Sequence, residues 1–346
     1  MQSLARAGYA HADGLAHLFL AMAAYCQPAR VARWDCAPCA KASAAFGARG
    51  GFAVRRQFYG NASSMQGYVA SGAGLVVVSF RGSVEYLSYW IDLEEYRTAP
   101  YPDCDACLVH SGFLSAWEDV RADVLSGVRD ALRAQPDAAL VVVGHSLGGA
   151  VAVIAALQLA KADGAKPPAA VFTFGEPRIG NAAFALFYEA AAAHWATWRV
   201  THEHDLVPHL PPRSMLVPFV LDYAHHTREV WYHAANASAP DAPAQHRLCS
   251  AKVGEDFDCA DSVWVYELSI ADHLHYLGQT VGVIGCADPA RSPRAGRAPA
   301  DDAAALDRLE AGTPAAWRWV RALWRTVRAR LADELGARMR RPWAAI

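Results

Sequence analysis

The sequence alternates short apolar runs, rich in β-branched residues, with longer stretches rich in Ala and Leu. The short runs span residues 74–80, 138–143, 169–174 and 197–201. The longer stretches have helical patterns and span residues 113–133, 150–162 and 182–194. Continuous short apolar runs are typical of strands buried on both faces of a parallel sheet. The alternation therefore predicts an α/β fold, with helices on both faces of a predominantly parallel central sheet.

The sequence changes in character after residue 286. Residues 287–300 are rich in Pro, Arg, Ala and Gly, a composition typical of a linker. Beyond it, large apolar residues recur at helical spacing, namely Trp317, Val320, Trp324, Val327 and Leu331. The adjacent row consists of Arg318, Arg321, Arg325 and Arg328. We therefore expect a folded domain over residues 1–286, a linker over 287–300 and a basic amphipathic helical tail over 301–346.

Charge limits the partners that such a chain can have. Residues 287–346 carry twelve arginines and seven acidic residues, so this tail has a net charge of +5 and the rest of the chain −7. The body has no global attraction for nucleic acid, and no nucleic-acid partner is expected. The basic helix either packs on its own domain or lies on an anionic membrane surface. Peripheral membrane contact through residues 317–331 is therefore an open alternative.

The eight cysteines indicate the compartment. Three pairs are close in sequence, namely Cys36 and Cys39, Cys104 and Cys107, and Cys249 and Cys259. The other two cysteines, Cys26 and Cys286, bracket the domain. This even set favours disulfides. A zinc site is disfavoured because 64 residues separate the two Cys-x-x-Cys units, and we expect neither a metal nor a cofactor. Together with Asn-x-Ser sequons at Asn61 and Asn236, disulfides predict a secreted glycoprotein or one in the secretory-pathway lumen.

An apolar run near the N-terminus, residues 15–24, admits two interpretations. Only Arg6 supplies a positive charge ahead of the run and His17 interrupts it, so we favour a structural helix over a signal-peptide core. No stretch approaches the ~20 uninterrupted apolar residues that span a bilayer. A transmembrane protein is not expected.

The run at residues 139–143 leads into Gly-His-Ser-Leu-Gly and then into a helix expected to begin near Ala150. In this strand–turn–helix context, Gly-x-Ser-x-Gly is typical of a nucleophile elbow, whose glycines allow a sharp turn that lifts the serine hydroxyl above the sheet edge. The following helix directs its free amides at developing negative charge. The alternative is a glycine-containing turn without a catalytic role. The motif makes Ser146 the candidate nucleophile.

A nucleophilic serine needs a base and an acid that orients the base. In an open parallel sheet both are expected just after the carboxyl ends of later strands. Asp205 follows the run at 197–201, and His273 follows the last apolar run, so the order Ser, Asp, His is that of α/β hydrolases. The rivals are His275 for the base and Asp272 or Glu203 for the acid, while His204, His225 and His226 are expected to make loop hydrogen bonds.

An oxyanion hole requires amide donors, one of them from the residue after the nucleophile, here Leu147. The second is expected from Phe80-Arg81-Gly82-Ser83, at the end of the strongest predicted strand. The Ser83 hydroxyl is a further candidate donor. The alternative for this segment is a strand-ending turn.

Together these residues resemble the fungal class 3 lipase family, the triacylglycerol lipases of filamentous fungi and their relatives, over about residues 15–286. The motifs that carry the resemblance are residues 80–83, 110–113, 144–149, 174–181, 204–208 and 272–278. The resemblance implies an α/β-hydrolase fold in which Ser146, Asp205 and His273 form the triad, and Ser83 and Leu147 the oxyanion hole. The tail after residue 287 lies outside the family pattern.

The resemblance also implies disulfides and a lid. The disulfides are Cys26–Cys286, Cys36–Cys39 and Cys104–Cys107, with Cys249–Cys259 as the remaining pair. The lid is residues 84–96, a short amphipathic segment whose apolar, substrate-contacting side includes Tyr86, Leu87, Tyr89, Trp90 and Ile91. Opening of such a segment exposes apolar surface to a lipid interface. This sequence departs from the family at Tyr89, where Asn is usual, and by one inserted residue.

The sequence therefore predicts a serine carboxylic-ester hydrolase that acts on lipids at an oil–water or membrane interface, most simply a triacylglycerol lipase working through an acyl-enzyme. A phospholipase A1, an sn-1 diacylglycerol lipase or a feruloyl-type esterase would use the same site. The apolar lid favours long-chain esters over the last of these. The alternative outside enzymes is a catalytically silent hydrolase fold that binds lipid.

Overall fold

The computed structural model describes residues 8–83, 98–213, 222–233, 246–264 and 267–286. These all belong to one unit, Met1–Ser292. A second unit, Pro293–Ile346, has no described residue. The predicted linker and helical tail, the sequon at Asn236 and the predicted lid therefore lie outside the described residues.

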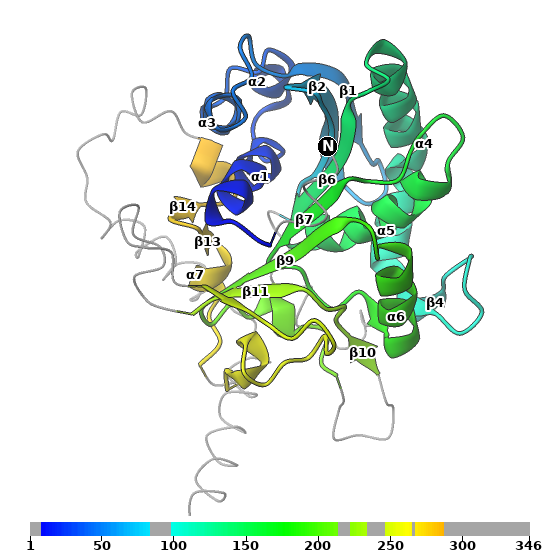
Figure 1. Cartoon of the computed structure of the whole chain (residues 1–346), viewed down its shortest axis with the longest axis vertical. Helices are drawn as coiled ribbons and strands as arrows, with labels where there is room; N and C mark the ends of the chain where they lie inside the picture. Colours follow the sequence, from blue (N-terminus) through cyan, green and yellow to red (C-terminus); the bar gives the residue numbers. More distant parts are fainter. Residues whose placement is uncertain (1–7, 84–97, 214–221, 234–245, 265–266, 287–346) are drawn as a thin grey trace, which may run out of the picture. The chain divides into compact units, whose positions relative to one another are not determined.

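An eight-stranded sheet runs through the centre of the described chain (Figure 1). Its strands, in spatial order, are β1 Ala53–Tyr59, β2 Gln66–Gly72, β3 Leu75–Phe80, β6 Ala139–His145, β7 Ala170–Phe174, β9 Ala196–His202, β11 Glu229–Tyr232 and β12 His246–Leu248. Strands β3, β6, β7, β9 and β11 are parallel to their neighbours in this series. The antiparallel pairs β1–β2, β2–β3 and β11–β12 lie toward the two edges. The four predicted strands are thus confirmed as the parallel centre.

Strand β6 shows why this sheet has two cores. All seven of its residues are buried. Because successive side chains of a strand point to opposite faces, Leu140 and Val142 enter one hydrophobic cluster, and Val141 and Val143 enter the other. A continuous apolar run therefore supplies both faces at once.

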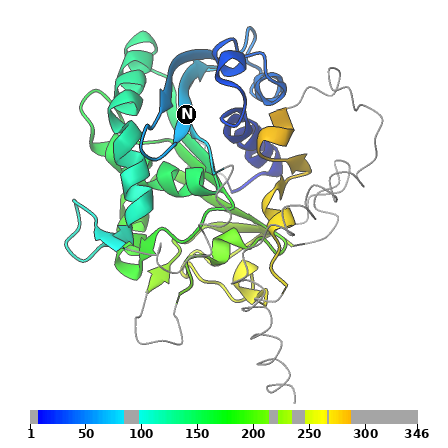
Figure 2. The ribbon, with the colours of Figure 1, turned by 180° about the vertical axis from the view of Figure 1, so that it is seen from behind.

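Helices cover both faces of the sheet, as Figures 1 and 2 show from opposite sides. One face packs against α4 Ser111–Ala134, α5 Leu147–Lys161 and α6 Ala182–Ala191. The other packs against α1 His11–Ala23, α2 Pro28–Ala32 and α3 Ala37–Ala45. Helix α1 contains the apolar run that the sequence assigned to a structural helix, and its Leu18 and Leu20 side chains are fully buried. Helix α5 begins at Leu147, three residues before the predicted start at Ala150.

Smaller elements complete the description. A four-stranded sheet has the order β10 Tyr223–Ala224, β8 Gly180–Asn181, β5 Leu108–His110 and β4 Thr98–Pro100. The last described segment contains α7 Ile270–His273 and the hairpin β13 His275–Tyr276 with β14 Gln279–Thr280. Short 3₁₀ helices span Val207–His209, Ala260–Ser262 and Val283–Cys286. Among the described helices, none is both long and apolar enough to cross a membrane.

All eight cysteines are paired, in the combination that the family resemblance implies. The disulfides are Cys26–Cys286, Cys36–Cys39, Cys104–Cys107 and Cys249–Cys259. The first disulfide joins Cys26, which lies shortly after α1, to Cys286, the last described residue. It closes a loop with a sequence separation of 260 residues.

Candidate active site

Ser146 lies at the junction where strand β6 ends and helix α5 begins. Its backbone has φ of 59° and ψ of −132°, a conformation that non-glycine residues rarely adopt. Its amide donates a hydrogen bond to the carbonyl of Phe174 at 2.9 Å, which ties the turn to the neighbouring strand β7. Such a strained conformation persists only where the surrounding structure imposes it. It is the conformation expected of the serine in a nucleophile elbow.

The two glycines of the motif let backbones approach one another around this turn. A Cβ atom added to Gly144 would lie 2.1 Å from the carbonyl oxygen of Gly148, and one added to Gly148 would lie 2.3 Å from that of Phe80. Both distances are far below a normal contact. The helix therefore packs directly on the ends of β6 and β3 because neither position carries a side chain.

Asp205 and His273 form a close, buried pair. The Nδ1 atom of His273 lies 2.8 Å from Oδ2 and 3.0 Å from Oδ1 of Asp205. Asp205 follows β9 by three residues, and His273 ends α7. The segment before α7 is held against the Asp205 loop because the amide of Ser269 donates to His204 and its carbonyl accepts from Leu206. These bonds bring together two residues that are 68 positions apart.

The surroundings of Asp205 favour its ionised form. Burial by itself raises the pKa of the carboxyl group, but the charge and hydrogen bond of His273, with hydrogen bonds from the Tyr276 hydroxyl and the Val207 amide, outweigh it. The net result is a pKa below the ordinary value. An ionised Asp205 accepts the Nδ1 proton of His273, which leaves Nε2 of the same ring as the atom that can take a proton from a hydroxyl group.

The rivals for base and acid make other contacts. The Nδ1 atom of His275 bonds the carbonyl of Ala271 at 3.0 Å. Asp272 accepts from the amide of His204 at 3.2 Å, and Glu203 lies 3.7 Å from His202. The geometry therefore favours His273 and Asp205 over these alternatives.

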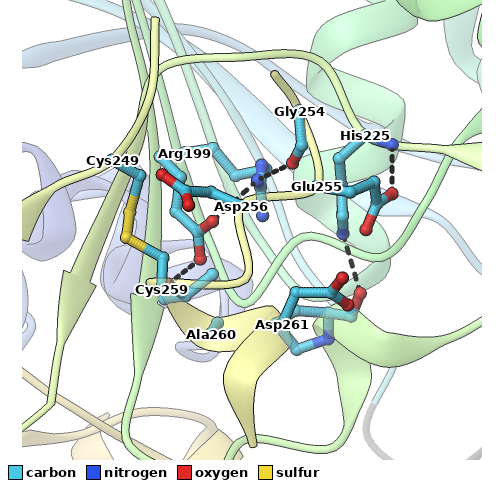
Figure 3. Close-up of polar contacts among 12 residues, drawn as sticks. Arg199, His225, Cys249, Gly254, Glu255, Asp256, Cys259, Ala260 and Asp261 are labelled. Atoms are coloured by element: carbon cyan, nitrogen blue, oxygen red, sulfur yellow. Dashed lines mark hydrogen bonds and ion pairs between the residues drawn. A yellow bond between two sulfur atoms is a disulfide. The ribbon is translucent and has the colours of Figure 1, made fainter. Parts of the chain in front are cut away.

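A buried network of charged side chains supports the loop that carries Asp205. Figure 3 shows part of this network, where the amide of His225 contacts Glu255. The guanidinium of Arg178 makes two hydrogen bonds of 2.8 Å to Glu255, and it also donates to the carbonyl of His209 at 2.6 Å. His209 in turn bonds the backbone carbonyl of Asp205 at 3.0 Å. The ion pair thus reaches Asp205 through a single residue.

The predicted loop histidines contribute to the same region. His225 bonds the carbonyl of Pro208 through Nε2 at 2.7 Å, and its amide donates to Glu255 at 2.8 Å. His226 pairs with the buried Glu176 at 3.1 Å. His225 and His226 therefore make loop contacts, as expected.

The segment predicted to supply the second oxyanion donor lies against Ser146. Phe80, the last residue of β3, is paired in register with Gly144. A Cβ atom added to Gly82 would lie 2.8 Å from the Cβ of Ser146. Ser83 is half-buried, and Leu147 is the first residue of α5, where the amide has no partner within the helix. Among the described residues, the Ser146 hydroxyl makes no hydrogen bond to His273.

Two buried tyrosines contact this site and were not predicted. Tyr276 donates its hydroxyl to Asp205, and Tyr25 bonds His145, the residue before Ser146, at 2.6 Å. Tyr276 follows His273 by three residues, so its place beside the pair was a usable signal. Tyr25 is 120 positions from His145, and no local pattern points to it.

One group among the described residues has the side chains that could ligate a metal ion. Glu229 lies beside Cys249 and Cys259, with potential ligand atoms within 4.8 Å of one another. The two sulfur atoms are joined in a disulfide, however, and a metal binds the thiolate. This group therefore does not form a metal centre. The predicted lid residues, Tyr86 to Ile91, lie outside the described residues.

Comparison with known proteins agrees with this geometry. Residues 77–215 match the family model described as Lipase (class 3). A lipase of Rhizopus niveus is 30% identical over 262 residues, which cover 74% of this chain and 61% of the relative. A secreted mono- and diacylglycerol lipase of Fusarium solani is 38% identical over 174 residues, which cover 50% of this chain and 49% of the relative. The chain thus spans less than two thirds of the length of these curated relatives.

Solved structures match more of their length. Lipase II from Rhizopus niveus superposes with a TM-score of 0.67 at 27% identity, and the match covers 79% of this chain and 96% of that one. The lipase from Rhizopus microsporus var. chinensis gives 0.66 at 29% identity, with 80% and 90% covered. The sequence motifs, the strained serine turn and these similarities agree. Residues 77–215 thus match the class 3 lipases, and the described domain has the fold of these α/β hydrolases.

Proposed function

We propose that this protein is a serine carboxylic-ester hydrolase that acts on lipids, a triacylglycerol lipase in its simplest form. One observation carries the proposal: the buried His273–Asp205 pair lies beside the strained turn of Ser146, since the His273 carbonyl is 2.9 Å from Nε2 of the neighbouring His145. Ser146 is the nucleophile, His273 the base, Asp205 the orienting acid, and Leu147 with Ser83 the oxyanion donors.

The reaction is acyl transfer to water in two halves. Nε2 of His273 takes the hydroxyl proton as Ser146 attacks the ester carbonyl, and the donors of Leu147 and Ser83 bind the oxyanion. Collapse breaks the ester C–O bond, and His273 gives its proton to the departing alcohol. Water then attacks the acyl-enzyme with His273 again as the base, which releases the fatty acid and restores Ser146.

Sequence and relatives support a lipid substrate and an extracellular location. The segment at residues 84–96 mixes aromatic and acidic residues, as suits a cover that opens at an oil–water or membrane interface. The Fusarium and Penicillium relatives are named secreted lipases. Four disulfides and the exposed sequon at Asn61 fit passage through an oxidising secretory pathway. We include glycosylation at Asn61 in the proposal.

A second candidate, hydrolysis of partial glycerides, is favoured by one observation. The relatives at 38% identity are named mono- and diacylglycerol lipases. Initial rates on emulsified triolein, diolein and mono-olein, with phosphatidylcholine and methyl ferulate alongside, separate the candidates. A rate on triolein at least comparable to that on diolein supports the triacylglycerol lipase, whereas diolein turnover without triolein turnover supports the second candidate.

The variant Ser146→Ala tests the nucleophile. We expect kcat on an ester substrate to fall by about 10⁴-fold or more, because the triad acts as a unit. The matched control is Ser115→Ala, an exposed serine on α4, which we expect to keep the wild-type rate. Both are measured by fatty-acid titration and by labelling with a fluorophosphonate probe. Near-normal hydrolysis by Ser146→Ala would refute the assignment.

A further inference from the structure

A buried chain of hydrogen bonds connects the oxyanion segment to the proposed base. The amide of Gly82 donates to the Tyr25 hydroxyl oxygen at 3.0 Å. That hydroxyl lies 2.6 Å from Nδ1 of His145, and Nε2 of His145 lies 2.9 Å from the carbonyl oxygen of His273. These hydrogen bonds thus join the segments that follow β3 and α1 to the end of β6 and to α7. The two side chains involved, Tyr25 and His145, are both buried.

The direction of each bond follows from chemistry. A carbonyl oxygen only accepts, so Nε2 of His145 carries the hydrogen that points to His273. A neutral imidazole with its hydrogen on Nε2 has a bare Nδ1, which accepts from the Tyr25 hydroxyl. The oxygen of Tyr25 then remains free to accept from Gly82. Every donor faces an acceptor, and one arrangement satisfies them all.

The protonation of these groups is constant over the working range of pH. Burial, with the charge of His273 as a smaller cause, lowers the pKa of His145 to about 3. Burial raises the pKa of Tyr25 far above neutrality. The directions of these hydrogen bonds therefore do not change with pH in this range.

We propose that Tyr25 and His145 are positioning residues, which hold the oxyanion segment and the backbone of His273 at a set distance on either side of Ser146. The inference rests on the proposed esterase function. It concerns the alignment of the reacting groups, a property that neither the triad motif nor the family match assigns to these side chains.

The contacts around Ser146 explain why this alignment matters. Gly82 lies close enough to Ser146 that it has no room for a side chain. On the other side, the rings of His145 and His273 lie 4.5 Å apart between centroids. Tyr25 and His145 therefore set the positions of both the segment that carries the oxyanion donor Ser83 and the backbone of the base His273. A displacement of about 1 Å in such a site costs roughly 100-fold in rate.

The first test is Tyr25→Phe, which removes one oxygen atom and leaves the Gly82 amide and Nδ1 of His145 without their partner. With p-nitrophenyl butyrate, a soluble ester that reports the chemical step without an interface, we expect kcat to fall about 10- to 100-fold. We expect KM to stay within about twofold, because the acyl-binding surface is unchanged. Thermal unfolding and circular dichroism establish that the variant is folded.

The matched control is Tyr68→Phe. Tyr68 is also fully buried, and its hydroxyl donates to the carbonyl of Leu20 in α1 at 2.8 Å. This control removes a buried tyrosine hydroxyl bonded to the same helix region but outside the chain described above. We expect its stability to fall while kcat stays within twofold of the wild type.

A second pair of variants tests His145 independently. The amide nitrogen of Gln occupies the place of Nε2, so His145→Gln keeps a donor for the His273 carbonyl, whereas His145→Phe keeps only the ring shape. We expect His145→Gln to retain at least tenfold more kcat than His145→Phe. A purely structural role for the ring predicts the reverse order.

The outcomes separate this inference from the function on which it rests. A wild-type protein that is neither labelled by a fluorophosphonate nor active on any ester refutes the proposed function. An active wild type in which Tyr25→Phe keeps its kcat within twofold, or in which Tyr68→Phe loses as much kcat as Tyr25→Phe, overturns the positioning role alone.

Discussion

Asp205 is held by hydrogen-bond donors from three different elements. The ring of His273, the hydroxyl of Tyr276 and the amide of Val207 all point to its carboxylate. Three donors to one buried carboxylate fix both its orientation and its charge. The proposed acid of this site is therefore also a structural anchor, and its replacement should affect activity and stability together.

The variant Asp205→Asn tests the effect on activity at pH 7 and the effect on stability as a function of pH. At pH 7 we expect kcat to fall by about 10⁴-fold, because an amide does not hold the imidazole in the required tautomer. The folded-state pKa of Asp205 lies below its ordinary value of about 3.9, so the ionised carboxylate stabilises the fold fully above that value. That contribution is lost as the pH falls through the lower, folded-state pKa.

The measurement is the free energy of unfolding of both proteins in urea at steps from pH 7 to pH 3. We expect the gap between wild type and Asp205→Asn to shrink toward the acid end. Asp137→Asn, at an exposed turn, is the control and should change the free energy of unfolding at pH 7 by less than about 0.5 kcal/mol. A gap for Asp205→Asn that is constant with pH would contradict the account.

The same residues show how far sequence reasoning reaches. Ser146 stands in a turn motif that is readable because its strain is local and its glycines are required by nearby backbone. Asp205 and His273 were predicted from chain order and from their place after apolar runs. The run before Asp205 is strand β9, whereas the described part of the run before His273 forms only an isolated bridge at Ser269. Tyr25 was not predictable, since its role depends on a contact across 120 positions that leaves no periodic trace.

At the level of elements, burial on both faces decided which strands could be predicted. Strands β3, β6, β7 and β9 are continuous apolar runs. Strand β1 carries two arginines and exposes much of its length, and β11 includes Glu229, whose charge is neutralised by Arg199 across the sheet at 3.2 Å. A charged residue in a short segment hides the apolar pattern of a strand, because the oppositely charged residue that pairs with it is known only from the fold.

The ion pair between Arg178 and Glu255 links two loops, and we predict a large cost for breaking it. The variant Glu255→Ala leaves a buried guanidinium without its main partner, which typically lowers the free energy of unfolding by about 3 to 5 kcal/mol. Asp130→Ala, which removes an exposed pair with Arg133, is the control and should cost less than about 1 kcal/mol. Urea unfolding measures both, and equal small losses would show that the buried pair adds nothing.

At the scale of the whole molecule, the disulfide Cys26–Cys286 joins two distant parts of the chain that pack in the same hydrophobic core. In the chain-entropy view, closing this loop of 260 residues stabilises the fold by about 5 kcal/mol, against about 2 kcal/mol for the short loop of Cys36–Cys39. The double variant Cys26→Ser/Cys286→Ser should therefore lose more stability than Cys36→Ser/Cys39→Ser. Thermal unfolding of the two variants compares them, and the opposite order would contradict the loop-length argument.

The bond between Cys26 and Cys286 also changes the connectivity of the folded domain. Because their sulfur atoms are bonded, the backbone from Cys26 to Cys286 forms a covalent ring. One proteolytic cut inside a ring linearises it without producing a free fragment. After one cut between Cys26 and Cys286, a second cut, or reduction of this disulfide, is needed before any fragment of the ring can separate.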